Sequence, residues 1–558
     1  MNFQMTKADS LKELRPLRGT RYVRRARWGW AGGNASSRPA RGYTARGPVV
    51  CALLLLLAGC AGPGASANLA AGNSALQVYL YQEPTGVFSP LAPASGPDTQ
   101  VLSFIEEGLL AVGPDYRMRP RIAHDYRVSP DARTFTFHLR PDARWSDGRA
   151  LTSADLVFTY RLLGDKRSTS ANASNYADIS ALSAPDAHTF VIRTGKPDAG
   201  LLARIGTSPI LPAHVLGGIS VEKVAKAPYF RSPTVTNGPF RFVDYRSNQF
   251  VHVTENRYYY RKVGIRDIYL KMMKSDVAAA QLRSGGLDIA SLSPTDLDVA
   301  SGFPSVRIAS GLGAGFVRIA LNQSKPYFRD VRVRRAFLYA VDRRKIVRNV
   351  LLGNAEVQNS DFFNRSAPRD LDPYTYDPAE ARALLAEAGW DPNRTLTLQL
   401  VPGQRDRDLT AMVVAEQLGK VGVRVRINQV QAAQLPPSYT DRSYDLTLYG
   451  GGNYAADPNS VAVISGCGQF YPDGGNIDLF CDRDLDRLMD RANALADPRA
   501  RAATYADAAR RSNAMADLMW LYAPRGLWGV NKRVHGFRAP GSQDTPAFWD
   551  PASWRLTR

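Results

Sequence analysis

The sequence predicts an α/β architecture with more than one sheet. Strand-like and helix-like segments alternate along most of the chain, which is typical of mixed α/β folds. Residues 76–81 and 134–139 alternate apolar and polar side chains, as strands do. With 558 residues, the chain is long enough for two or three domains.

Three predicted helices have recognisable first turns. Thr152 or Ser153 can accept a hydrogen bond from the free amides of the first turn, and Asp155 suits the positive end of the helix dipole. Asp330 precedes a basic amphipathic helix whose apolar residues are spaced for one buried face. Asp377 caps a third helix, which has proline at its first position.

An apolar run of roughly ten residues, 49–58, indicates export from the cytoplasm. It is shorter than the roughly 20 residues of a membrane-spanning helix and has the length of a signal-peptide core. The sequence Leu57-Ala58-Gly59-Cys60 also resembles a bacterial lipobox, whose cysteine is lipidated and becomes the new N-terminus. A buried core segment ending in Cys is the less favoured interpretation. We therefore expect a lipoprotein-type signal region at 1–59 and a flexible tether at 60–75, with the mature chain anchored to the cell membrane on its periplasmic side or outer face.

The charge of the chain is concentrated near its start. Residues 1–59 hold 11 Lys and Arg residues against 2 acidic ones, which is nearly half of the net charge of +20. This segment is long for a basic signal region, and a start codon farther downstream would explain its length. Beyond it the basic residues are scattered and form no run interleaved with aromatics, which argues against nucleic-acid binding. Weak attraction to an anionic membrane is the simpler interpretation.

Two of the four cysteines are left for the mature domain. Cys51 belongs to the signal region and Cys60 to the lipobox, so Cys467 and Cys481 remain. In an exported domain two such residues most simply form a disulfide. A metal site is the competing interpretation, but no histidine or further cysteine stands nearby at ligand spacing. We expect no metal and no cofactor.

Catalytic motifs are missing from the sequence. The 6 histidines are isolated, and the chain has no His-Glu-x-x-His, no Gly-x-Ser-x-Gly and no phosphate-binding loop. Glu106 and Glu107 are neighbours on a predicted helix, where adjacent side chains do not face each other. An enzyme, such as a secreted hydrolase, is therefore a distant alternative.

An ordered series of motifs resembles the family 5 extracellular solute-binding proteins, the dipeptide- and oligopeptide-binding receptors of bacterial ABC importers. A single motif of this kind also occurs outside the family. The whole set in this order, from about residue 76 to 540, is typical of the family. The motifs are Glu106-Glu107-Gly108-Leu109-Leu110, Phe135 to Arg140, Trp145-Ser146-Asp147-Gly148, Leu151 to Tyr160, Asn237-Gly238-Pro239-Phe240, Leu321 to Phe328, Ala340-Val341-Asp342-Arg343 and Ala383 to Trp390.

The resemblance implies a two-lobed periplasmic-binding-protein fold with mixed sheets, an inserted subdomain and a two-strand hinge. Lobe I would combine residues 76–110, 234–315 and 525–558, the inserted domain II would span 111–233, and lobe III would span 316–524. The hinge strands would be 316–321 and 520–524. Ligand would lie in the cleft and be enclosed when the lobes close. The resemblance also places Cys467 and Cys481 where dipeptide-type members carry a paired cysteine loop.

The ligand is expected to be a peptide, although the sequence departs from the peptide-receptor pattern. Such receptors hold the free amine with an aspartate, whose position here is Tyr454, and the tryptophan of the same loop is replaced by Gly451. Asp457 either reaches the ligand instead or caps a turn. Arg405 stands where dipeptide receptors keep an arginine for the ligand carboxylate, which suits a guanidinium fork. A solvated surface loop is the alternative for Arg405.

The remaining candidate ligand contacts lie on two walls of the expected cleft. They are Tyr79, Tyr81 and Glu83 at the end of the first strand, and Asn453 on the loop of lobe III. The alternative to a peptide is a non-peptide solute in the same fold, such as an oligosaccharide or a metal chelate. The resemblance implies a monomer that delivers its solute to ABC permease subunits, with the membrane contacted through the lipid anchor.

Overall fold

The computed structural model describes residues 74–557, apart from a few short segments. These segments are 93–94, 116, 169, 171–172, 312–314, 361–367, 432–433, 453–456 and 542–547. Cys60 and the signal region precede the described residues, and Asn453 and Tyr454 also fall outside them. Residues 63–558 cluster as one compact unit by their contacts. No helix in the described part of the chain is long and apolar enough to cross a membrane.

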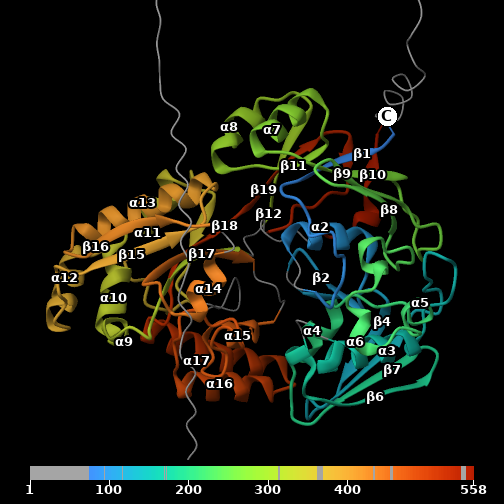
Figure 1. Cartoon of the computed structure of the whole chain (residues 1–558), viewed down its shortest axis with the longest axis horizontal. Helices are drawn as coiled ribbons and strands as arrows, with labels where there is room; N and C mark the ends of the chain where they lie inside the picture. Colours follow the sequence, from blue (N-terminus) through green and yellow to red (C-terminus); the bar gives the residue numbers. More distant parts are fainter. Residues whose placement is uncertain are drawn as a thin grey trace, which may run out of the picture. The chain divides into compact units, whose positions relative to one another are not determined.

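A seven-stranded mixed sheet forms around the first strand (Figure 1). β1 (Leu76–Leu80) lies in its middle and runs parallel to both neighbours. All five residues of β1 are buried, although the sequence alternates apolar and polar, because both faces of this central strand are covered. In spatial order the sheet consists of β12 (Val306–Gly311), β19 (Gly526–Asn531), β11 (Ile289–Ser291), β1, β10 (Asp267–Met272), β9 (Phe250–Glu255) and β8 (Phe240–Arg246).

A second, four-stranded antiparallel sheet is formed entirely by residues 123–194. Its order is β4 (Ala123–Val128), β5 (Thr134–Leu139), β7 (Thr189–Thr194) and β6 (Ile179–Asp186). β5 alternates buried and partly exposed residues, as its sequence pattern predicts. Aromatic side chains of the sheet and of the following helix fill the core beneath it, among them Phe135, Phe137, Tyr160 and Phe190.

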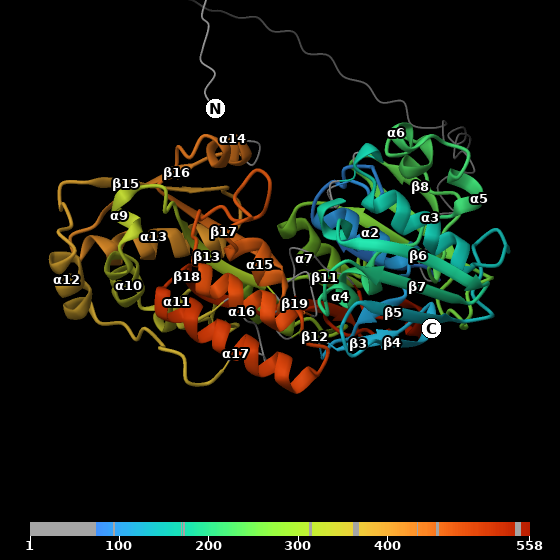
Figure 2. The same ribbon diagram turned by 90° about the horizontal axis from the view of Figure 1, so that it is seen from below.

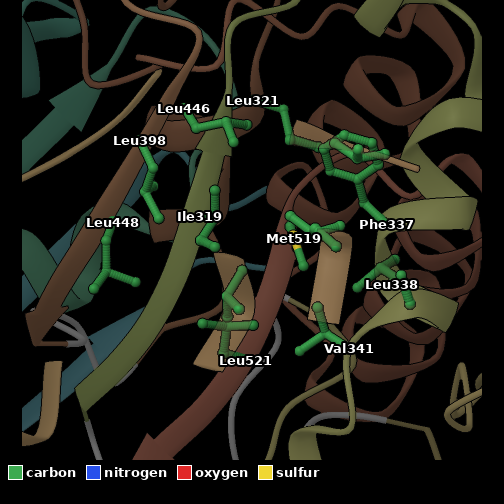
Figure 3. Close-up of a cluster of buried hydrophobic side chains, with 14 of the residues drawn as sticks. Ile319, Leu321, Phe337, Leu338, Val341, Leu398, Leu446, Leu448, Met519 and Leu521 are labelled. Atoms are coloured by element: carbon green, nitrogen blue, oxygen red, sulfur yellow. The ribbon is translucent and has the colours of Figure 1, made fainter. Parts of the chain in front are cut away.

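The third large sheet has six strands and a core of its own. Its order is β14 (Ala355–Val357), β18 (Met519–Pro524), β13 (Gly315–Leu321), β17 (Leu446–Gly452), β15 (Thr395–Leu400) and β16 (Arg424–Gln429). Leucine, isoleucine and methionine side chains of four of these strands pack against residues at and just beyond α10 (Val331–Ala340), as Figure 3 shows. The labelled strand residues are Ile319, Leu321, Leu398, Leu446, Leu448, Met519 and Leu521.

The chain passes between the seven- and six-stranded sheets at two neighbouring places. β12 leads to β13, and β18 leads through Arg525 to β19. β12 and β19 are paired in one sheet, and β13 and β18 are paired in the other. The two crossings therefore lie side by side, although their strands are about 200 residues apart in the sequence.

Helices cover the sheets and connect their strands (Figures 1 and 2). Two small two-stranded sheets complete the fold: β2 (Leu110–Val112) with β3 (Met118–Pro120), and β20 (Val534–His535) with β21 (Arg555–Leu556). Besides α10, the helices are α2 (Gly96–Ile105), α3 (Ser153–Gly164), α4 (Leu201–Thr207), α5 (Ala213–Leu216), α6 (Val221–Val224), α7 (Ser275–Ser284), α8 (Leu297–Ser301), α9 (Pro326–Arg329), α11 (Arg343–Asn349), α12 (Pro378–Glu387), α13 (Arg405–Gly419), α14 (Leu435–Thr440), α15 (Ser460–Ser465), α16 (Arg483–Asn493) and α17 (Pro498–Met515).

The predicted helix starts are confirmed by their caps. Thr152 and Asp155 form a reciprocal capping box at the start of α3. The Asp330 carboxylate accepts a hydrogen bond from the amide of Arg332, and that of Asp377 accepts from two amides of α12. Local side-chain chemistry thus sets where these helices begin.

Candidate ligand-binding site

The end of β1 lies in a largely buried environment. Tyr79 is only 4% exposed and packs with Leu282 and Leu527, so its ring belongs to a hydrophobic core. Burial, and to a lesser degree Asp276, raises the pKa of Tyr79 to about 12. Tyr81 is partly buried and packs against the same cluster. Tyr79 is therefore a core residue, and Tyr81 is nearer the surface.

Glu83 follows β1 and is held by hydrogen bonds from another part of the sheet. Its carboxylate accepts from the Tyr245 hydroxyl and from the amide of Asn248, the latter at 2.9 Å. Burial acts to raise the pKa of Glu83, but hydrogen bonds from Tyr245, Ser247 and Asn248 outweigh it and lower the pKa below its usual value. Glu83 is thus a fixed carboxylate at neutral pH.

The C-terminal end of β17, an interior strand of the six-stranded sheet, carries the second group of candidate residues. Gly451 is buried and lies opposite Phe316 of β13. A Cβ atom on Gly450 would lie 2.3 Å from Cζ and Nη2 of Arg407, so the guanidinium of Arg407 rests directly on the backbone of β17. A side chain at position 450 would therefore displace the guanidinium of Arg407.

Arg405 and Arg407 both belong to the first turn of α13 but differ in environment. Arg405 is the first residue of the helix and is exposed, whereas Arg407 is partly buried against β17. Residues two apart on a helix point to different sides. The sequence suggested Arg405 because it stands where dipeptide receptors keep an arginine for the ligand carboxylate, and its charged run 405–408 made a solvated surface loop the alternative. Helical patterning of the residues that follow would have been the signal for Arg407.

Asp457 is engaged within its own sheet region. Its carboxylate accepts two hydrogen bonds from the guanidinium of Arg501, and both side chains are about seven-eighths buried. It also accepts a hydrogen bond from the amide of Asn459 at 2.9 Å, just before α15. This contact is the turn-capping role that the sequence offered as the alternative for Asp457.

An aromatic cluster lies near the C-terminal end of β17 and involves β13 and β18. Phe316 and Trp520 meet edge to face at 5.3 Å, and Tyr449 lies 5.9 Å from Phe316. Beneath them, Arg318 places its guanidinium carbon 5.6 Å from the Tyr449 ring and 5.7 Å from the Trp520 ring. These contacts connect β13, β17 and β18, and Tyr449 is partly exposed.

One contact connects the region of the four-stranded sheet with the helices beside the six-stranded sheet. The amide of Ala199 donates to the carbonyl oxygen of Asn493 at 2.8 Å. The Asn493 side chain is fixed in turn by Asn459 and by the Tyr505 hydroxyl. These distant segments therefore meet on the same side as the Asp457–Arg501 pair.

The last two features concern the cysteine pair and possible metal-binding groups. Cys467 and Cys481 form a disulfide, as the sequence predicts. Among the described residues, no group of three or more His, Cys, Asp or Glu side chains could hold a metal ion.

The sequence also matches characterised groups of proteins. The profile of bacterial extracellular solute-binding proteins, family 5 Middle, matches residues 117–471. A Brucella ovis protein with the provisional name ABC transporter peptide-binding protein is 29% identical over 478 residues, which cover 84% of this chain and 88% of that protein. The oligopeptide-binding protein AppA of Bacillus subtilis is 23% identical over 524 residues, covering 89% and 96%.

Solved structures show the same fold. AppA of B. subtilis in complex with a nonapeptide has a TM-score of 0.77 at 23% identity, covering 87% of this chain and 99% of AppA. NikZ of Campylobacter jejuni in complex with Ni(L-His) has the same TM-score and coverage at 21% identity. The predicted periplasmic-binding-protein fold is thus confirmed. Because the profile match extends over more than half of its residues, the chain belongs to the family 5 bacterial extracellular solute-binding proteins, which are receptors and not enzymes.

Proposed function

We propose that this extracellular solute-binding protein captures peptides and delivers them to the permease of an ABC importer. The observation that carries the proposal is the seating of Arg407 on the glycine backbone of β17, because a guanidinium fork there suits a carboxylate. Gly450 and Gly451 place no side chain on this part of β17. The relatives named for peptide binding support the same ligand class.

The proposed cleft has two walls. Lobe I, formed by residues 76–110, 234–315 and 525–558, contributes Tyr81 and Glu83, with Tyr79 behind them. Lobe III, residues 316–524, contributes Gly451, Asn453, Tyr454 and Arg407, with Arg405 as the second cation and Asp457 as the support of the loop. Glu83 is a carboxylate suited to a peptide amine, given its lowered pKa.

Closure of the lobes is proposed to enclose the ligand. The two adjacent crossings, β12–β13 and β18–β19, would act as the hinge. Domain II, residues 111–233, would follow lobe I in this motion. The hydrogen bond from Ala199 to Asn493 would then be a contact of the closed state, since it joins domain II to lobe III.

We also propose that the mature protein is a monomer anchored to the membrane by lipid on Cys60. The lipobox-like sequence at 57–60 supports the anchor. Residues 60–75 would be the tether that keeps the receptor near its permease.

Mass spectrometry of solute that co-purifies from the native host tests the proposal. Peptides should be released on denaturation, and they should raise the unfolding temperature of the emptied protein when added back. Recovery of an oligosaccharide or a metal chelate without any peptide would contradict peptide capture while leaving the receptor role intact.

A further inference from the structure

A cavity of about 280 Å³ lies between the start of the seven-stranded sheet region and the inserted residues 111–233. One side is formed by Ser89, Pro90 and Ala92 and by one face of α2. The other side is formed by Tyr176 and by the end of α4. The α2 residues that face the cavity are Thr99, Leu102 and Ser103, which follow the helical spacing of a single face, and Glu106 caps the C-terminal end of the helix.

Among the described residues, Glu106 is the only charged one that lines this cavity. Its Oε2 atom is buried and has no hydrogen-bond partner among the residues that the structure describes. Burial raises the pKa of Glu106 well above its usual range. Its neighbour Glu107, in contrast, is contacted by Arg121 at 3.4 Å and by the Tyr259 hydroxyl at 2.9 Å. A buried carboxylate is costly unless it is paired, and Glu106 has no ion pair like that of Glu107 with Arg121. A bound cation would supply the missing counter-charge and favour the ionised form of Glu106.

Four hydroxyl groups around the cavity use their hydrogens within the protein and can only accept hydrogen bonds from an occupant. Thr99 donates its hydroxyl hydrogen to the carbonyl of Ser95, and Ser103 donates to that of Gln100 at 2.7 Å. On the α4 side, Thr207 and Ser208 donate to backbone carbonyls in the same way, at 2.9 and 2.8 Å. A hydroxyl has one hydrogen and two acceptor lone pairs, so these four groups offer only lone pairs to an occupant. Because Ser208 already donates to the carbonyl of Arg204, the Tyr176 hydroxyl donates to Ser208 and occupies one of its two lone pairs.

Charge and size together define the occupant. The lining residues that the structure describes include no Lys, Arg or His, and a carboxyl group surrounded by hydroxyl lone pairs suits a cation that carries several N–H donors. Leu102 and Pro209 add an apolar wall for a short alkyl chain. An apolar cavity of roughly 150 Å³ accommodates benzene, so this one has room for a chain of about four carbons with its head group.

We infer that the cavity between α2 and α4 binds an alkylammonium or alkylguanidinium group through Glu106 and the surrounding hydroxyl oxygens. The cation is either a free small amine or the basic side chain of a bound peptide. In the second case the inference rests on the proposed function.

Calorimetry on the full-length protein tests this site with n-butylguanidinium, n-butylammonium and the uncharged isostere n-butylurea. The two cations should bind and the urea should not. Glu106→Gln keeps the shape of the side chain but removes its charge, and it should weaken cation binding at least ~30-fold. Ser103→Ala removes one acceptor and should cost about tenfold. Glu222→Gln, an exposed glutamate of α6, is the matched control and should bind like the wild type.

Peptide probes distinguish the two sources of the cation. If the group is a peptide side chain, Ala-Lys-Ala should bind more tightly than Ala-norleucine-Ala, and Glu106→Gln should abolish the difference. Binding of the cations without binding of any peptide would support the site and contradict the proposed function. Absence of cation binding, or equal binding to wild type and Glu106→Gln with unchanged unfolding temperature, would overturn the inference.

Discussion

Arg318 of β13 and Asp478 form an ion pair that is almost completely withdrawn from solvent, with the two side chains 1% and 0% exposed. Asp478 also accepts a hydrogen bond from the amide of Leu321 at 3.0 Å. The pair therefore connects a strand next to the crossings with the loop that the Cys467–Cys481 disulfide closes. Removing one partner would leave the other charge buried.

Arg318→Met should lower the free energy of unfolding by about 3–5 kcal/mol, because Asp478 would remain as an uncompensated buried charge. Urea unfolding measures this loss. The double variant Arg318→Met/Asp478→Asn should be more stable than Arg318→Met, since it removes the stranded charge. Arg487→Met, which breaks the exposed pair with Asp484, is the control and should change stability by less than ~1 kcal/mol. A loss of that small size for Arg318→Met would refute the role given to the pair.

Replacing both Cys467 and Cys481 with serine should cost about 3 kcal/mol, because the loop between them would lose its closure in the unfolded state. Unfolding curves recorded with and without reductant measure the effect. Reductant should destabilise the wild type by a similar amount and leave the double variant unchanged. Equal stability of both proteins under oxidising conditions would show that the disulfide is dispensable.

Arg407→Ala should weaken binding of a peptide with a free C-terminal carboxylate by ~30-fold or more, as expected for loss of a charge-assisted contact. Gly450→Ala should have a similar effect, because a Cβ atom there displaces the guanidinium of Arg407. Calorimetry with the peptide and its C-terminal amide gives the measurement.

The controls for this prediction lie on the same helix. Gly419→Ala meets no neighbouring atom within 4 Å and should bind normally. Arg405→Ala should lose less affinity than Arg407→Ala, since Arg405 is exposed. A loss of ~30-fold for Arg405→Ala, with Arg407→Ala within threefold of the wild type, would assign the carboxylate contact to Arg405.

Metabolic labelling with a fatty-acid probe tests the anchor. The wild type and Cys51→Ala should both be labelled, because Cys51 lies within the signal region, whereas Cys60→Ala should not be labelled. Equal labelling of Cys60→Ala and the wild type would exclude lipidation at the predicted cysteine.

The site shows why the sequence alone could not predict which partners single side chains contact. Arg405 and Arg407 belong to one charged run, and only the start of α13 at Arg405 decides that Arg407 is the one that reaches β17. Asp457 and Arg501 are 44 positions apart, and nothing in either local sequence indicates that they pair. Such contacts depend on how strands and helices pack over long separations.

The sequence by itself determined the local structure and the family. Short-range chemistry was enough for the capping residues Thr152, Asp330 and Asp377 and for the alternation of β5. The tertiary structure decided which polar groups are buried and which find partners. Glu106 and Glu107 are adjacent and chemically identical, yet only Glu107 meets Arg121, while Glu106 lines a cavity. The reason is physical: burial and pairing depend on neighbours that the fold brings from distant parts of the chain.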